Sequence, residues 1–126
     1  MLDFRLDEEQ KMLVEAISRF ANERARKTFR DAEEAGHIPT DVVQAALELG
    51  VPPTAIPGAY GGFGEHSVVT AAVATEEFAW GDLATTFKIM LPNLVAIPLM
   101  LAGSDAQKAA WLPRFAGELP PPVSAA

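Results

Sequence analysis

The chain has 126 residues, a formal net charge of −7 and no cysteine, and apolar residues make up 49% of it. This length suits one domain with a single modest core, and the apolar fraction argues against disorder. The negative charge argues against a nucleic-acid partner, and the lack of cysteine excludes disulfides, thiolate metal ligands and cysteine nucleophiles. The composition fits a reducing cytoplasm, and the first residues predict no secretory or transit signal.

Charge is concentrated at the start of the chain. Residues 1–41 carry 7 Lys or Arg and 10 Asp or Glu, out of 10 and 17 in the whole chain. A domain that stands alone needs polar surface on each of its outer elements. We therefore expect the second part of the chain to be covered by more protein.

The first predicted helix begins at Asp7, where Asp7 and Gln10 have the spacing of a capping box. Leu13, Ile17 and Phe20 recur every three or four residues, which predicts an amphipathic helix with one buried face. The segment Asp31–Pro39 is expected to break this helix.

Two further helices are predicted before the most apolar part of the chain. The first runs from Thr40 to Gly50 and is followed by a loop, Val51–Gly64, that contains three prolines and four glycines. The second runs from Glu65 to Trp80, and Asp82 is placed to cap the helix that comes next.

The stretch "TTFKIMLPNLVAIPLML" is open to three interpretations: a membrane span, a core helix or the wall of an apolar pocket. A continuous helix from Leu83 to Leu101 would be about 28 Å long, marginally enough for a bilayer. Lys88, Pro92 and Pro98 argue against insertion, since a central charge and a lost backbone hydrogen bond are both costly in lipid. We expect two helices that meet near Leu91, with Pro92 in the first turn of the second helix and Pro98 kinking it.

One face of these two helices carries a hydroxyl and an amide among apolar side chains. The spacing favours a plain core face over a pocket wall, without excluding the latter. The residues on this face are Thr86, Met90, Asn93, Leu94 and Ile97.

The last predicted helix begins at Ser104, which forms a second capping box with Gln107, and ends at Gly117. The proline-rich residues 118–126 then form a connector. The expected fold is all-α, a compact bundle of five to six helices in one domain over residues 1–117.

No catalytic or metal-binding constellation is visible. His37 and His66 are the only histidines, and neighbouring carboxylates such as Glu76 and Glu77 point about 100° apart on a helix. The sequence Gly62–Ser67 resembles a dinucleotide-binding loop but lacks the preceding strand, so a rigid loop between helices is the preferred interpretation.

The order of segments resembles the acyl-CoA dehydrogenase family. "FRLDEEQKMLVEAISRFANE", "HIPTDVVQAALELGV", "IPGAYGGFG" and "VATEEFAWGD" are each similar to successive parts of its N-terminal helical domain. The most specific match is "LPNLVAIPLMLAGSDAQKAAWLPRFAGE", and the five segments together cover nearly the whole chain in order.

The resemblance implies an all-helical N-terminal domain of an FAD-dependent enzyme. In that family a glutamate removes the α-proton of an acyl-CoA thioester, the flavin accepts the β-hydride, and electrons leave through an electron-transfer flavoprotein. It also implies homo-oligomers, while the β-domain and the glutamate-bearing domain would follow this chain. This chain is therefore expected to carry no catalytic residue and to be inactive alone.

By register with "PLMLAG", the resemblance places four residues on the wall of the acyl-chain pocket: Thr86, Phe87, Met90 and Leu94. The bulk of Phe87 and Met90, together with Val95-Ala96 where a small or polar pair is common, suggests a short, branched or bent acyl group. Lys88 is unusual in this run and has no assigned role. The alternative is a stand-alone helical interaction module that kept the fold and lost the chemistry.

Overall fold

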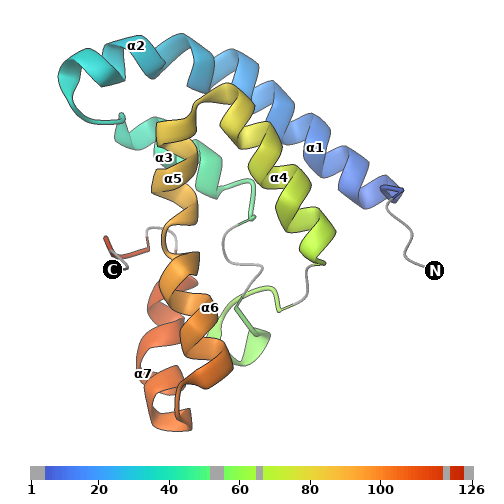
Figure 1. The fold of residues 1–126 in the computed structure, drawn as a ribbon, viewed down its shortest axis with the longest axis vertical. Helices are drawn as coiled ribbons and strands as arrows, with labels where there is room; N and C mark the ends of the chain where they lie inside the picture. The colour runs from blue at the N-terminus through green and yellow to red at the C-terminus, as the bar shows by residue number, and fades with distance from the viewer. Residues whose placement is uncertain (1–4, 52–55, 65–66, 118–119, 124–126) are drawn as a thin grey trace.

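The computed structural model describes residues 5–51, 56–64, 67–117 and 120–123 of the chain, and in those residues the regular elements are all helical (Figure 1). The predicted all-α fold is confirmed. The α-helices are α1 (Glu8–Phe20), α2 (Arg26–Ala35), α3 (Thr40–Leu47), α4 (Val68–Gly81), α5 (Leu83–Met90), α6 (Asn93–Ala102) and α7 (Asp105–Phe115). A π-helical turn, η1 (Ala21–Ala25), joins α1 to α2, and a 3-10 turn, η3 (Gly58–Tyr60), lies in the loop after α3.

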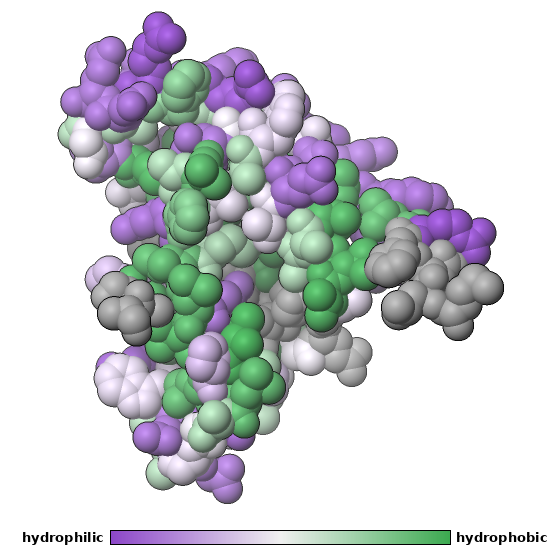
Figure 2. Space-filling view, viewed as in Figure 1, coloured by the Kyte–Doolittle hydropathy of each residue, from purple (hydrophilic) through white to green (hydrophobic). Residues whose placement is uncertain are grey.

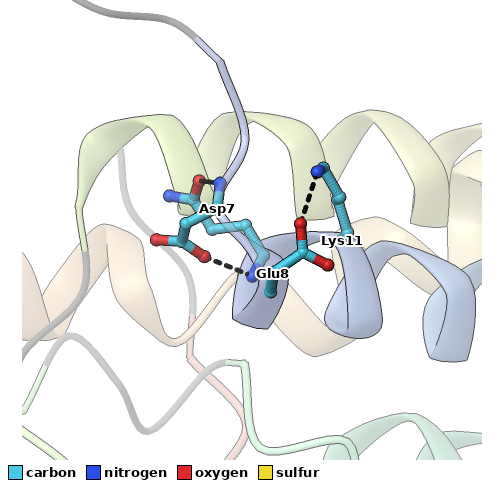
Figure 3. A network of polar contacts seen from close by, with 4 residues as sticks. Asp7, Glu8 and Lys11 are labelled. Carbon is cyan, nitrogen blue, oxygen red and sulfur yellow. Dashed lines mark hydrogen bonds and ion pairs between the residues drawn. The ribbon is translucent and has the colours of Figure 1, made fainter.

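The segments α1, η1 and α2 form one long rod along one edge of the molecule (Figure 1). Its start is the predicted capping box: Gln10 N donates to Asp7 Oδ1 at 2.8 Å, and Asp7 N donates to Gln10 Oε1 at 3.0 Å. Figure 3 shows this cap beside the exposed Lys11–Glu8 ion pair, 2.7 Å long. An exposed pair of this kind stabilises a helix only slightly.

The predicted break at Asp31 is wrong, because the rod continues to Ala35. Residues 31–35 are mostly Ala and Glu, which propagate a helix well. The helix ends only where Gly36 adopts a left-handed conformation with φ of 72°, which an L side chain rarely takes.

The main core lies where α1, α3, α4 and α5 meet. Ile17 and Phe20 of α1 pack against Phe78 of α4, with the two phenyl rings edge to face at 5.9 Å between centroids. The helices α1 and α4 run in the same direction, since Gln10 Nε2 donates to Thr70 Oγ1 at 2.8 Å near their starts. Near their ends, Gly81 lies directly against Ala21.

The helix α4 begins later than predicted, at Val68, with the side chain of Ser67 accepting from Thr70 N at 3.0 Å. The predicted first residues Glu65 and His66 lie outside the described part of the chain.

The apolar stretch is two helices, as predicted. The chain turns at Leu91 and Pro92 between α5 and α6, although Pro92 occupies the N-cap position rather than the first helical turn. Pro98 lies inside α6.

The helices α6 and α7 form a hairpin below the main core (Figure 1). Their interface is a second, smaller cluster made by Ile56, Ala96, Leu112 and Phe115. The predicted capping box at Ser104 and Gln107 starts α7, and the helix ends at Phe115, two residues before the predicted stop. Val123 of the proline-rich tail packs against this cluster. The division at residue 117 stays a prediction.

Candidate functional site

An exposed apolar stripe runs along α5 and α6. It consists of six residues separated by alternating steps of four and three, and Figure 2 shows apolar side chains gathered over these two helices. They are Leu83, Phe87, Met90, Leu94, Ile97 and Leu101. Met90 is half-buried, and the other five count among the exposed large hydrophobic residues of the described chain. We call this surface the α5–α6 stripe.

The opposite side of the same two helices holds them to the core. Thr85, Thr86 and Ile89 of α5 and Ala96 of α6 are buried. The start of α5 is fixed by Asp82, whose Oδ2 accepts from Thr85 N at 2.7 Å and from Thr85 Oγ1 at 2.6 Å. The stripe is therefore presented by well-anchored helices rather than by a loop.

The four residues predicted to line the acyl-chain pocket do not all lie together. Phe87 and Leu94 belong to the stripe and are 60% and 54% exposed. Met90 also belongs to it, and its side chain packs in part against the main core. Thr86 is only 4% exposed, and its hydroxyl donates to the Asp82 carbonyl at 2.8 Å, so it points to the core side of α5. None of these placements tests contact with an acyl chain.

Sequence analysis missed both ends of the stripe. The predicted face was Thr86, Met90, Asn93, Leu94 and Ile97, and three of these five, Met90, Leu94 and Ile97, belong to the stripe. Leu83 and Leu101, at the two ends of the stripe, were not predicted. The alternating four and three spacing of large apolar residues was the available signal. Spacing alone does not say which side of an almost wholly apolar helix meets the core.

The stripe belongs to a stretch, Leu83–Ala102, that is long and apolar enough to cross a membrane by length and composition, and 28% of an apolar 18-residue segment of it is buried in the protein. Core helices of soluble proteins can have the same length and apolar composition. The turn at Leu91 and Pro92 interrupts the stretch. The expectation of no membrane insertion stays a prediction.

A groove of about 460 Å³ lies away from the stripe, between the start of α1, the end of α3 and the start of α4. Its apolar lining includes Leu13, Leu49 and Phe63, and Phe63 is 68% exposed. Asp7 and Glu9 lie at its acidic side. We call it the α1–α4 groove.

A second groove, of about 820 Å³, separates the end of α2 from the start of α5. Its walls are Phe29 of α2, Ile38 of the turn before α3, and Leu83, Phe87 and Lys88, which are spread along α5 from its first to its last turn. We call it the α2–α5 groove.

The neighbouring carboxylates Glu76 and Glu77 lie in different surroundings on α4. Glu76 is exposed on α4, and its neighbour Glu77 is half-buried on another side of the helix. Among the described residues, no three His, Asp or Glu side chains gather as metal ligands. The segment Gly62–Ser67, which resembles a dinucleotide motif, follows a 3-10 turn, Gly58–Tyr60, where such a motif has a strand.

Comparison with known proteins gives one consistent result. The family model "Acyl-CoA dehydrogenase, N-terminal domain" matches residues 7–118. The chain is 36% identical over 118 residues to (2S)-methylsuccinyl-CoA dehydrogenase of Cereibacter sphaeroides, covering 92% of this chain and 21% of that protein. It is 31% identical over 117 residues to the probable medium-chain specific acyl-CoA dehydrogenase 2, mitochondrial, of Caenorhabditis briggsae, covering 93% of this chain and 28% of that protein.

Two solved structures share the fold. Butyryl-CoA dehydrogenase from Megasphaera elsdenii superposes with a TM-score of 0.76 at 23% identity, over 93% of this chain and 31% of that one. A chain of the structure reported as "Electron transferring flavoprotein of Acidaminococcus fermentans: Towards a mechanism of flavin-based electron bifurcation" superposes with a TM-score of 0.75 at 26% identity, over 91% of this chain and 30% of that one. The chain thus spans less than a third of the length of each of these proteins.

Proposed function

The chain belongs to the acyl-CoA dehydrogenase family, as its N-terminal domain, and we propose that it forms one wall of the acyl-chain pocket of a complete FAD-dependent dehydrogenase. The observation that carries this proposal is the α5–α6 stripe. Three of the four residues that the family resemblance assigns to the pocket, Phe87, Met90 and Leu94, belong to it. Thr86 lies on the core side of α5, where its hydrogen bond to the Asp82 carbonyl would help to hold the helix in place.

The stripe suits an acyl chain because it is apolar and lies on rigid helices. Each buried methylene of a ligand contributes about 0.8 kcal/mol. Selectivity for the length of the acyl chain therefore depends on how many of its methylenes the wall can cover. Large side chains at Phe87 and Met90 shorten the available space, which favours a short or branched acyl group. The relatives are named for methylsuccinyl, medium-chain and butyryl substrates, so family membership alone does not choose the chain length.

Substitution of Met90 tests the wall. In the complete enzyme, Met90→Trp is expected to shift the kcat/KM profile toward shorter acyl-CoA thioesters, because the larger side chain fills space that the end of a longer chain would use. Met12→Trp is a matched control, since Met12 is 70% exposed on α1, far from the stripe in sequence and on another helix. An unchanged chain-length profile for Met90→Trp would remove Met90 from the wall.

FAD is implied by the family, and it supplies the hydride acceptor when bound. The described residues do not by themselves fit a flavin. In the described part of the glycine-rich loop between α3 and α4, a 3-10 turn stands where a strand would aim the loop at a phosphate, and Gly62 is tightly packed against Ile56. We propose that the flavin and the catalytic glutamate are held by the part of the enzyme that this chain does not contain.

The electron-transfer partner needs a surface of its own. We propose that an electron-transfer flavoprotein docks at the α1–α4 groove, because the lining of this groove shares no residue with the stripe. Its exposed Phe63 beside Leu13 and Leu49 supplies an apolar anchor, and Glu9 favours a basic rim on the partner. In the complete enzyme, Phe63→Ala is expected to weaken partner binding by about tenfold or more, whereas Trp111→Ala on α7 does not. Equal affinities for both variants would refute this location.

A stand-alone helical interaction module is the alternative. The alternating four and three spacing of the stripe is also the spacing of a helix–helix seam, so a partner helix could cover it. Reading the coding sequence past Ala126 separates the two proposals. A later glutamate-bearing domain, and a yellow purified protein that oxidises acyl-CoA, support the dehydrogenase. A stop codon there and a colourless protein that gains no flavin absorbance support the module.

A further inference from the structure

Lys88 is the single charged residue between Leu83 and Ala102. It is exposed, and it lines the α2–α5 groove of about 820 Å³. Together with His37 and Ile38, it also lines an adjoining cavity of about 450 Å³ that continues between α3 and the turn at Leu91. The ammonium group therefore stands where two largely apolar hollows meet. Their volumes fall within the range of small-molecule sites, about 300 to 1,000 Å³.

Two carboxylates, those of Glu33 and Asp82, line the same groove as Lys88, and among the described residues neither is recorded in an ion pair with it. Among the described residues, the ion pair that the structure records is Lys11–Glu8, on the far side of the molecule. The Asp82 carboxylate lines the groove, but its Oδ2 already accepts from Thr85 N and Oγ1. Glu33 is exposed on the α2 side. Lys88 thus remains available to an anion from outside.

The remaining lining is suited to an apolar body. Phe29 of α2 and Phe87 of α5 are 44% and 60% exposed, and Leu83 is 58% exposed. Beside them, His37 Nδ1–H donates to the Ala35 carbonyl at 3.2 Å, which holds the imidazole at the turn before α3.

We propose that the α2–α5 groove binds an amphiphilic carboxylate, whose hydrocarbon body lies against Phe29, Leu83 and Phe87 and whose carboxylate pairs with Lys88 Nζ. A carboxylate accepts charge-assisted hydrogen bonds from an ammonium, whereas a neutral or cationic amphiphile gains nothing from this charge. The site does not depend on the proposed dehydrogenase function. Phe87 is the residue that it shares with the predicted acyl-chain wall.

Titration of the ¹⁵N-labelled chain with octanoate, and in parallel with the neutral probe 1-octanol, tests the site by amide chemical shifts. We expect octanoate to bind about tenfold more tightly than octanol, as one charge-assisted hydrogen bond provides. The shifts should centre on residues 29–38 and 82–88. Equal affinities for the two probes, or shifts centred on residues 94–101, would overturn the proposal.

Variants at Lys88 identify the anchor. Lys88→Met is expected to abolish the preference for octanoate over octanol, and Lys88→Arg to keep it, because only the second retains the charge. Lys27→Met is the matched control, since Lys27 is an exposed lysine on α2 that does not line the groove. A Lys88→Met protein with an unaltered amide spectrum outside the groove and the full tenfold preference would refute the role of Lys88. Loss of the preference in Lys27→Met as well would refute it too.

Discussion

Gly81, the last residue of α4, packs tightly against Ala21 and Ala25 of η1, and its replacement by alanine tests how the core positions α5. A Cβ at residue 81 would lie 2.8 Å from Ala21 Cβ, 3.0 Å from Ala21 Cα and 3.3 Å from Ala25 Cβ. Carbon atoms in optimal contact are about 3.5 to 4.0 Å apart, so the helices would have to separate by roughly 0.7 Å. Because α5 begins two residues later, the stripe would move with them.

The expected loss of stability follows from two opposing effects. Overpacking of a well-packed interface costs about 1 to 3 kcal/mol. Alanine has a helix propensity up to about 1 kcal/mol better than glycine, but Gly81 is the last residue of α4, where that gain is smaller. We therefore expect Gly81→Ala to lower the free energy of unfolding by about 1 to 2 kcal/mol, measured by urea denaturation with circular dichroism.

A matched control and a compensating change make this test specific. Gly58→Ala introduces a methyl group with nothing within 4 Å and no positive φ, so its effect should stay within about 0.5 kcal/mol. Ala21→Gly removes the nearest methyl group, and the double variant should recover about 1 kcal/mol relative to the sum of the single changes. Additive effects, or a Gly81→Ala variant as stable as Gly58→Ala, would refute the steric argument.

Three further substitutions examine the loop, the cap and the lower hairpin. Gly62→Ala would place a methyl group 2.0 Å from the Ile56 carbonyl oxygen. We therefore expect the free energy of unfolding to fall by about 3 kcal/mol or more and the loop after α3 to be cleaved faster by proteases, and an unchanged cleavage rate would contradict the packing described. Asp82→Ala leaves the hydroxyl of Thr85, a residue that is only 4% exposed, without its acceptor. The free energy of unfolding should fall by about 1 to 3 kcal/mol, and by less in Asp82→Asn, whereas equal losses in the two variants would argue against the cap. Leu112→Ala empties the centre of the second cluster and should cost about 2 to 5 kcal/mol, with faster amide exchange in α6 and α7 than in α1 and α4. Uniformly faster exchange would show that the two clusters unfold as one unit.

Local signals in the sequence were sufficient for most helix starts. The capping boxes at Asp7 and Ser104 and the cap at Asp82 are found as predicted, because each depends on contacts within four residues. The break between α5 and α6 was also predictable, since Pro92 cannot donate a backbone hydrogen bond. The end of α2 was misjudged. Residues 31–35, which are mostly Ala and Glu, continue the helix, and it ends only where Gly36 adopts a left-handed conformation.

The sequence by itself determined the family, the all-helical class and the apolar character of α5 and α6, since these depend on residue order, caps and composition. Only the tertiary structure decided which side of α5 is free. Thr86 and Phe87 are neighbours in the chain, yet one is 4% exposed and the other 60%, because α4 and the Asp82 cap hold one side of α5 against the core. The polar residues of α5 do not mark its exposed side, because Thr85 and Thr86 are buried while Lys88 is exposed, so packing against distant helices decides which side is buried.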